Sequence, residues 1–169
     1  FANVARCTWG LCDYLKEASK ADNGLIVGYD TRFLSYEFAQ TVAGVCAQQG
    51  IKVQLCIEAA PTPVVSFNVL KYEANGAAII TSSHNPAQWN GFKFKPEYAG
   101  SATEAITKQV EEKIRLIDPI KTQNAQERTR YWVEEGRASG LIVDLDPAPL
   151  YLQHIASLVD LDLLRSFGH

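Results

Sequence analysis

Residues 25–81 carry the clearest structural pattern of the chain: LIVGYDTRFLSYEFAQTVAGVCAQQGIKVQLCIEAAPTPVVSFNVLKYEANGAAIIT. Short apolar runs alternate here with longer segments whose apolar residues recur every three or four positions. Runs of the first kind are typical of strands buried on both faces, and the second spacing is typical of helices. We expect strands at 25–29, 51–57 and 77–81, and helices at 35–50 and 62–76. This alternation predicts a parallel sheet covered by helices.

The pattern continues on both sides of this stretch. Apolar residues at helical spacing predict a helix within residues 1–20, and alternation over 91–95 predicts a fourth strand at the sheet edge. Ser101 and Glu104 have the spacing of a capping box, at the start of a helix that Pro119 ends. We therefore expect an α/β fold: a three-layer α/β/α domain with a mostly parallel, mixed sheet of about four strands.

The C-terminal part is expected to begin a second unit. Residues 121–140 are polar and charged and are expected to form a surface loop or bridge. We divide the chain into a domain at 1–138 and a linker with the first helix of a truncated second domain at 139–169. That helix, at 151–164, would leave an apolar face uncovered, so it should pack on the first domain or on another copy of the chain. The chain starts at Phe1 without methionine, and we expect it to be a fragment.

Composition excludes several classes of protein. The 169 residues are 47% apolar and 21% charged, which is typical of a globular domain rather than a disordered chain. A net charge of −3 argues against nucleic acid or an anionic membrane as partner. No stretch approaches the roughly 18 apolar residues that a membrane span needs. The four cysteines have no metal-site spacing, so buried thiols and a cytoplasmic location are expected.

The residues with most chemical content are Thr81-Ser82-Ser83-His84-Asn85-Pro86, followed by Asn90-Gly91-Phe92-Lys93. They come directly after an expected buried strand, at its carboxyl end, where open α/β sheets bind ligands. A polar turn without function is the simpler interpretation of such a stretch. The chain contains neither a G-x-S-x-G nucleophile elbow nor a glycine-rich phosphate loop of the Walker type.

The complete hexapeptide TSSHNP resembles the active-site serine motif T-[AGS]-S-H-N-P of the α-D-phosphohexomutases, the phosphoglucomutase/phosphomannomutase family. The following NGFK is similar to the family's N-G-[FIY]-K and has its usual spacing. Residues 28–32, GYDTR, resemble a G-x-D-x-R turn, with Tyr29 where the family often has arginine. Residues 146–152 resemble the connection into the family's second domain. The resemblance thus covers most of the chain.

The resemblance implies a reaction and its main residues. The family interconverts hexose 1-phosphate and hexose 6-phosphate through a phosphoserine and a hexose 1,6-bisphosphate, which also serves as activator. The phosphoserine would be Ser83, with His84 beside it and Lys93 in an electrostatic or acid–base role. A magnesium ion would bind Ser83 through its phosphate, held mainly by an aspartate loop of the second domain. Serine phosphate is stable enough in water to act as a reversible carrier.

Other interpretations stay open for the neighbouring residues. Asn85 and Asn90 could bind the substrate's phosphate or shape the loop. Asp30 and Arg32 could do the same, or form an internal ion pair that holds two loops. His84 could simply order the turn, and the lysine of NGFK could be a solvated strand residue.

Three elements of the family are not found in this chain. These are the arginine-bearing segment before the first helix, the Asp-x-Asp-x-Asp-Arg metal loop, and the sugar-selecting loop with the C-terminal phosphate-binding domain. The chain alone is therefore expected to be inactive, with a hexose phosphate and domains II–IV of the same protein as partners. A non-catalytic phosphosugar-binding module and, less favoured, a serine hydrolase are the alternatives. The loop that selects among glucose, mannose and glucosamine in the family is one of these missing elements.

Overall fold

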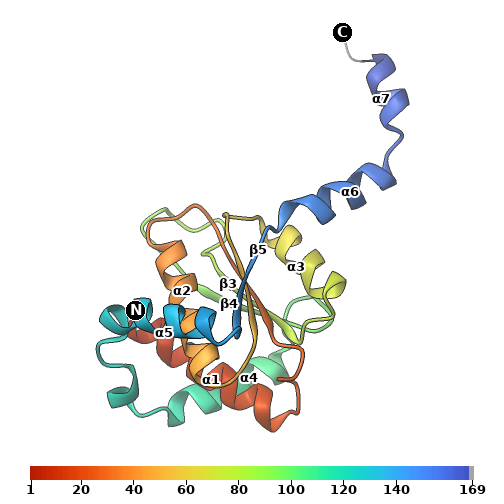
Figure 1. Cartoon of the computed structure of the whole chain (residues 1–169). Helices are drawn as coiled ribbons and strands as arrows, with labels where there is room; N and C mark the ends of the chain where they lie inside the picture. The colour runs from red at the N-terminus through yellow and green to blue at the C-terminus, as the bar shows by residue number, and fades with distance from the viewer. Residues whose placement is uncertain (168–169) are drawn as a thin grey trace.

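The computed structural model describes residues 1–167, and Figure 1 shows their arrangement. The elements are α1 (Ala2–Glu17), β1 (Leu25–Tyr29), α2 (Ser35–Gln48), β2 (Val53–Cys56), α3 (Thr62–Lys71), β3 (Gly76–Ile80), β4 (Phe92–Pro96), α4 (Glu104–Leu116), the 3-10 helix η1 (Pro119–Thr122), α5 (Ala125–Ala138), β5 (Ile142–Leu145), α6 (Ala148–Leu158) and α7 (Leu161–Phe167). The strands form one sheet in the order β4-β3-β1-β2-β5. The pairs β1–β2, β1–β3 and β2–β5 are parallel, and β4 is antiparallel to β3.

Helices cover both faces of this sheet. Helices α1, α2 and α5 pack together on one face, and α4 lies against α1 (Figure 1). Helix α3 covers the other face, where it contacts β1 and β3. The α/β/α architecture and the mostly parallel, mixed sheet are therefore as expected, with a fifth strand.

The centre of the sheet is buried and closely packed. All five residues of β1 and all five of β3 are buried, which is why both strands are uninterrupted apolar runs. Gly28 lies where α3 crosses β1. A Cβ atom at this position would be 2.5 Å from Cγ2 of Val65, so glycine permits the helix to approach the strand.

The polar segment 121–140 is not a surface loop, and that expectation is wrong. It contains η1 and then α5, which packs on α2 along a stripe of buried residues. Trp132 and Val133 are 2% and 3% exposed, and the hydroxyls of Thr41 and Thr129 are 2.9 Å apart between the two helices. The many charged side chains on the outer face of α5 hide this narrow apolar stripe in the sequence.

The capping box expected at Ser101 and Glu104 is also wrong. Helix α4 begins at Glu104, and its N-cap is Thr103, whose hydroxyl accepts a hydrogen bond from the backbone N–H of Ile106 at 3.4 Å. Threonine is itself a favourable N-cap residue, so the helix starts two positions later than the pattern indicated.

Strand β5 extends the sheet past the expected domain boundary. It pairs with β2 in parallel register, from Ile142 opposite Val53 to Leu145 opposite Cys56. Ile142 and Leu145 are buried, so this short apolar run is part of the first sheet. The division into 1–138 and 139–169 stays a prediction, and the sheet itself continues to Leu145.

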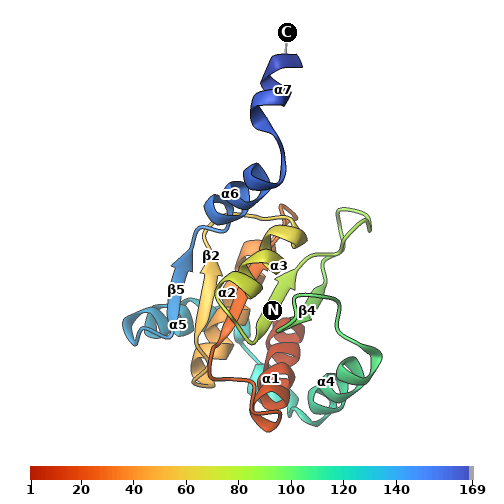
Figure 2. The ribbon, with the colours of Figure 1, turned by 90° about the vertical axis from the view of Figure 1, so that its right-hand side faces the viewer.

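The last two helices project from the body, as Figure 2 shows from a second direction. Phe67 of α3 contacts the rings of Tyr151 and His154 of α6, with centroids 5.6 and 5.0 Å away. Neither α6 nor the described α7 has a buried residue. The expected packing on the first domain is therefore wrong for α7 and limited to one narrow contact for α6, while packing on another copy stays a prediction.

The cysteines are free thiols, as expected. Cys12, Cys46 and Cys56 are buried and Cys7 is half-buried. Burial, and after it the charge of Asp146, raises the pKa of the Cys56 thiol to about 12. Across residues 1–167, no helix combines the length and apolarity needed to cross a bilayer.

Candidate active site

Two polar segments meet at the carboxyl edge of the sheet. Residues 81–91 connect β3 to β4, and residues 30–34 connect β1 to α2. Because β1 and β3 are parallel neighbours, their carboxyl ends lie side by side. The backbone N–H of Asp30 donates to the carbonyl of Ile80 at 3.1 Å, so the two segments diverge from a common point.

Ser83 lies exposed in the connection between β3 and β4. Its φ is +54°, a left-handed conformation that a residue with a Cβ adopts at a cost. Its backbone N–H donates to the hydroxyl of Thr81 at 3.1 Å, and its own Oγ is 3.3 Å from Nδ1 of His84. The expected carrier and its expected neighbour are therefore in contact.

Asn85 uses its side chain to shape the same turn. Its amide Nδ2 donates to the carbonyl of Ser82 at 3.0 Å and lies 3.3 Å from the Ser82 hydroxyl. The backbone N–H of Asn85 donates to the Ser82 carbonyl as well, at 3.0 Å. These contacts agree with the loop-shaping interpretation of this residue.

Asp30 collects hydrogen bonds from both segments. Its carboxylate accepts from the Ser35 hydroxyl at 2.8 Å, from the backbone N–H of Arg32 at 3.0 Å and from Nε of Arg32 at 3.1 Å. Partial burial raises the pKa of Asp30, but hydrogen bonds from Thr81, Arg32 and Ser35 together with the charge of Arg32 outweigh it, so the pKa is held below its usual value. The side chain therefore remains a carboxylate.

Arg32 joins the two segments. Besides its ion pair with Asp30, its Nη1 donates to the carbonyls of Pro86 and Trp89 at 2.8 and 3.0 Å. Its Nη2 donates to the carbonyls of Ser83 and Asn85 at 2.9 and 2.7 Å. The internal ion pair considered from the sequence is thus present, and the guanidinium reaches much further than Asp30.

Asn90 and Gly91 fix the C-terminal end of residues 81–91, which we call the serine loop. Nδ2 of Asn90 donates to the carbonyl of Phe33 at 3.2 Å and to the hydroxyl of Ser35 at 3.0 Å. A Cβ atom at Gly91 would lie 2.8 Å from the carbonyl oxygen of Thr81. The loop therefore closes through a contact that glycine allows, at the point where β4 begins.

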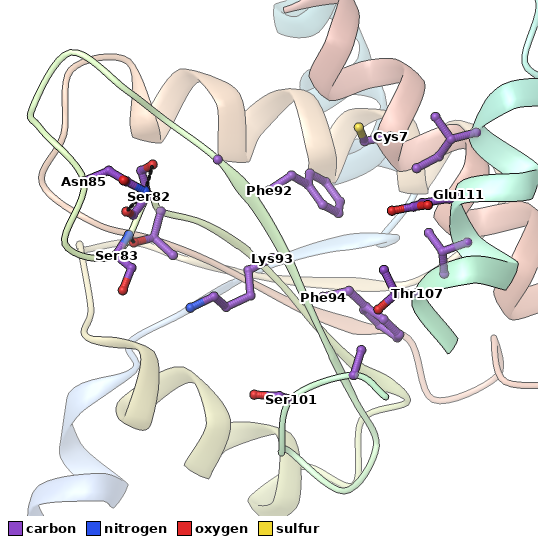
Figure 3. A pocket seen from close by; sticks show the side chains of 15 residues that line it. Cys7, Ser82, Ser83, Asn85, Phe92, Lys93, Phe94, Ser101, Thr107 and Glu111 are labelled. Atoms are coloured by element: carbon purple, nitrogen blue, oxygen red, sulfur yellow. Dashed lines mark hydrogen bonds between the residues drawn. The ribbon is translucent and has the colours of Figure 1, made fainter. Parts of the chain in front are cut away.

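A pocket of about 550 Å³ opens beside this loop, and both Ser83 and Lys93 line it. Figure 3 shows the Lys93 side chain extending toward the side of the pocket that holds Ser82, Ser83 and Asn85, while Phe92 and Phe94 line the part near α4. Among residues 1–167, no carboxylate forms an ion pair with Lys93. Burial, and after it the Lys93 charge, lowers the pKa of Lys95 on the same strand.

The residues at this site do not form a metal site by themselves. Within the described part of the chain, no group of three or more His, Cys, Asp or Glu side chains is placed to hold a metal ion. The carboxylate of the loop network, Asp30, already accepts three hydrogen bonds, from Arg32 and Ser35. The magnesium expected from the resemblance would need ligands from outside this site.

Two residues of the site have roles that sequence reasoning missed. Ser35 has the position of a helix N-cap in the sequence, but the N-cap of α2 is Leu34, and Ser35 instead links Asp30 to Asn90. Thr81 links Asp30 to the backbone of Ser83. Ser35 begins helix α2 and Thr81 directly follows strand β3. A hydroxyl residue beside a predicted helix or strand is the one feature of the sequence that could have pointed to them.

Comparison with known proteins gives a consistent result. Residues 1–121 match the family model described as "Phosphoglucomutase/phosphomannomutase, alpha/beta/alpha domain I". A phosphoglucomutase of Staphylococcus saprophyticus is 31% identical over 92% of this chain and 28% of its own length. A phosphoglucomutase of Komagataeibacter xylinus is 29% identical over 98% of this chain and 31% of its own length.

A solved structure extends the similarity to three dimensions. The crystal structure of a protein assigned as a phosphomannomutase, from Thermus thermophilus, superposes with a TM-score of 0.78 at 30% identity. The match covers 98% of this chain and 34% of the Thermus protein. The chain therefore spans about a third of the length of the relatives that it matches.

Proposed function

The chain belongs to the phosphoglucomutase/phosphomannomutase family, and from this premise we propose that it is the serine-bearing domain of a hexose phosphate mutase. The whole protein would interconvert hexose 1-phosphate and hexose 6-phosphate. One observation carries the proposal: Ser83, within TSSHNP after the carboxyl end of β3, and Lys93, within NGFK on β4, line one pocket.

The proposed reaction moves one phosphoryl group out and another back. The bond between phosphorus and Oγ of phosphorylated Ser83 breaks, and a bond to the free hydroxyl of a hexose monophosphate forms. The proton of that hydroxyl ends on Oγ, which leaves hexose 1,6-bisphosphate and free serine. Return of the other phosphate to Ser83 releases the isomeric monophosphate. Phosphoryl transfer depends mainly on the position of the reacting groups and on offsetting their charge. A hydrogen-bonded loop that carries Ser83 beside the cationic Lys93 suits this reaction.

His84 and Lys93 would assist this transfer in different ways. His84 Nδ1 is 3.3 Å from Oγ of Ser83, so it can hydrogen-bond the oxygen whose bond to phosphorus breaks. Lys93 points into the same side of the pocket and would offset charge on the transferred group or exchange its proton. Asn85 and Asn90 would act through the shape of the loop, since their amides are engaged within it.

Further parts of the proposal reach beyond this chain. Since the chain spans about a third of its relatives, we propose that the other domains of a mutase supply the metal ligands and the sugar contacts, and that the chain alone does not turn over substrate. When bound, magnesium would offset the phosphoserine charge, and hexose 1,6-bisphosphate would load the serine. The free thiols support a cytoplasmic location.

The test is phosphopeptide mapping of the full-length gene product after incubation with magnesium and glucose 1,6-bisphosphate. We expect one phosphate on Ser83, which disappears when glucose 1-phosphate is added. The variant Ser83→Ala should take up none, whereas the neighbouring Ser82→Ala should still be phosphorylated. A folded wild-type protein that leaves Ser83 unmodified would instead support a non-catalytic phosphosugar-binding module.

A further inference from the structure

The guanidinium of Arg32 has no free hydrogen-bond donor. An arginine side chain carries five N–H groups in one plane. In this structure Nε donates to Asp30, Nη1 donates to two carbonyls, and Nη2 donates to two more. All five N–H groups therefore have partners within the protein, and four of these partners are backbone carbonyls of one loop.

Because all five N–H groups are occupied, the structure distinguishes the two roles that the sequence leaves open for Arg32, which are binding a phosphate and shaping the loop. A phosphate group would need one or two of the N–H groups that the loop already occupies. Asp30 also offsets the positive charge at 3.1 Å, and the Arg32 side chain is only 14% exposed. Binding a phosphate would require Arg32 to release the very loop that carries Ser83. The contacts thus favour a role in shaping the loop.

The loop that Arg32 holds contains an unfavourable conformation. Ser83 has a φ of +54°, and a non-glycine residue keeps such a conformation when its surroundings impose it. The carbonyl of Ser83 accepts a hydrogen bond from Nη2, and so does the carbonyl of Asn85 two residues later. The other two carbonyls, of Pro86 and Trp89, lie on the second half of the loop. One planar group thereby fixes both halves of the turn.

We propose that Arg32 is the positioning residue of the phosphate-carrying loop: it gathers four backbone carbonyls of residues 83–89 and so holds Ser83 in the left-handed conformation that presents its hydroxyl to the pocket. That this positioning serves phosphoryl transfer rests on the proposed function. That Arg32 orders the loop rests on its hydrogen bonds alone.

Replacement of Arg32 by lysine distinguishes positioning from charge. Lysine keeps the positive charge but has a single nitrogen with three N–H groups on a flexible chain, so it cannot reach four carbonyls and Asp30 together. A purely electrostatic role, which needs only the positive charge, would largely survive Arg32→Lys. A positioning role would not.

The first measurement is hydrogen–deuterium exchange of the 169-residue chain. We expect amides of residues 82–91 to exchange about tenfold faster or more in Arg32→Lys than in wild type, because several hydrogen bonds that close the loop are lost. Exchange in β1 and α2 should stay unchanged. The matched control is Arg130→Lys, at an exposed arginine of α5 with an ion pair to Glu134. Unchanged exchange in the loop, or loss of protection throughout the chain, would overturn the proposal.

The second measurement uses the full-length gene product and the rate at which glucose 1,6-bisphosphate phosphorylates Ser83. Arg32→Lys and Arg32→Ala should both lower this rate by about tenfold or more, and added guanidinium should restore part of it in Arg32→Ala only. A rate in Arg32→Lys equal to wild type would contradict the positioning role. If wild type itself takes up no phosphate, the proposed function fails, while the exchange experiment still decides whether Arg32 orders the loop.

Discussion

Ser83 combines an exposed hydroxyl with a left-handed backbone, and the two properties can be separated by substitution. Ser83→Ala removes the hydroxyl and keeps the unfavourable φ, whereas Ser83→Gly removes both. A left-handed residue with a Cβ costs about 1–2 kcal/mol, and glycine loses about 0.5–1 kcal/mol through its greater freedom when unfolded. We expect Ser83→Gly to be more stable than Ser83→Ala by about 0.5–1 kcal/mol in urea unfolding. Equal or lower stability of the glycine variant would mean that the loop does not impose this conformation.

Asp30 should make the fold sensitive to acid. Its pKa is lower in the folded chain than the ordinary value near 3.9 that it has when unfolded, so the unfolded state takes up protons more readily. The stability from this carboxylate is present above about pH 5 and is lost as pH falls through its folded pKa. In urea unfolding from pH 7 to pH 3, the difference in unfolding free energy between wild type and Asp30→Asn should shrink toward the acid end. A difference that is constant with pH would contradict this assignment.

At the scale of elements, α5 contributes to the core through one narrow stripe. Trp132 is 2% exposed and packs where Gly44 of α2 leaves room, with its Cβ 2.8 Å from the position of a Cβ on that glycine. Trp132→Ala should lower the unfolding free energy by about 3–5 kcal/mol, as for other buried tryptophans. The neighbour Tyr131 is 62% exposed, and Tyr131→Ala should change it by about 0.5 kcal/mol or less. Similar effects of both variants in chemical denaturation would show that α5 is not docked on α2.

The elements that the sequence predicted well are those with an unbroken or strictly periodic apolar pattern. Strands β1 and β3 are buried on both faces, so each forms an uninterrupted apolar run that predicts a strand. The sequence of α5 predicts a polar loop or bridge instead of a helix, because only five of its residues are buried among many charged ones. Strand β5 falls in the segment for which the sequence predicts a linker, because two of its four residues are exposed and its apolar pattern is short. In a short helix or strand that is buried on one side only, the few apolar residues do not form a spacing that differs clearly from that of a polar connection.

Some residues of the site can be predicted from a local motif, and the contacts of others depend on how the chain folds. A local motif brings Ser83, His84, Asn85 and Lys93 near one another, because a connection between adjacent strands keeps them close in sequence and in space, and their roles stay a prediction. The contacts of Arg32 could not be predicted, since its partners are backbone carbonyls, which every residue has. The order of the strands, which brings residues 30–34 beside residues 81–91, is likewise a property of the folded sheet.

At the scale of the whole molecule, the sheet and the projecting helices should differ sharply in their contribution to stability. Residues 1–147 retain every strand and the contact in which Nδ2 of Asn68 donates to the carbonyl of Pro147 at 2.9 Å. Deletion of residues 148–169 removes the aromatic contacts of Phe67 and should lower the unfolding free energy by about 1 kcal/mol. Deletion of residues 141–169 also removes buried Ile142 and Leu145 and should lower it by about 3 kcal/mol or more. Equal losses in the two truncated chains would place β5 outside the folding unit.

The direction of β5 has a consequence for whatever is attached to α6 and α7. Because β5 is parallel to β2, and β2 to β1, it ends at the same edge of the sheet as β1 and β3, where the serine loop lies. The two projecting helices leave the body from that edge (Figure 2). A group carried on them would be tethered at that end of the sheet, and its encounter with Ser83 would then be governed by an effective concentration rather than by free diffusion. The length and stiffness of the 146–160 segment then set that concentration.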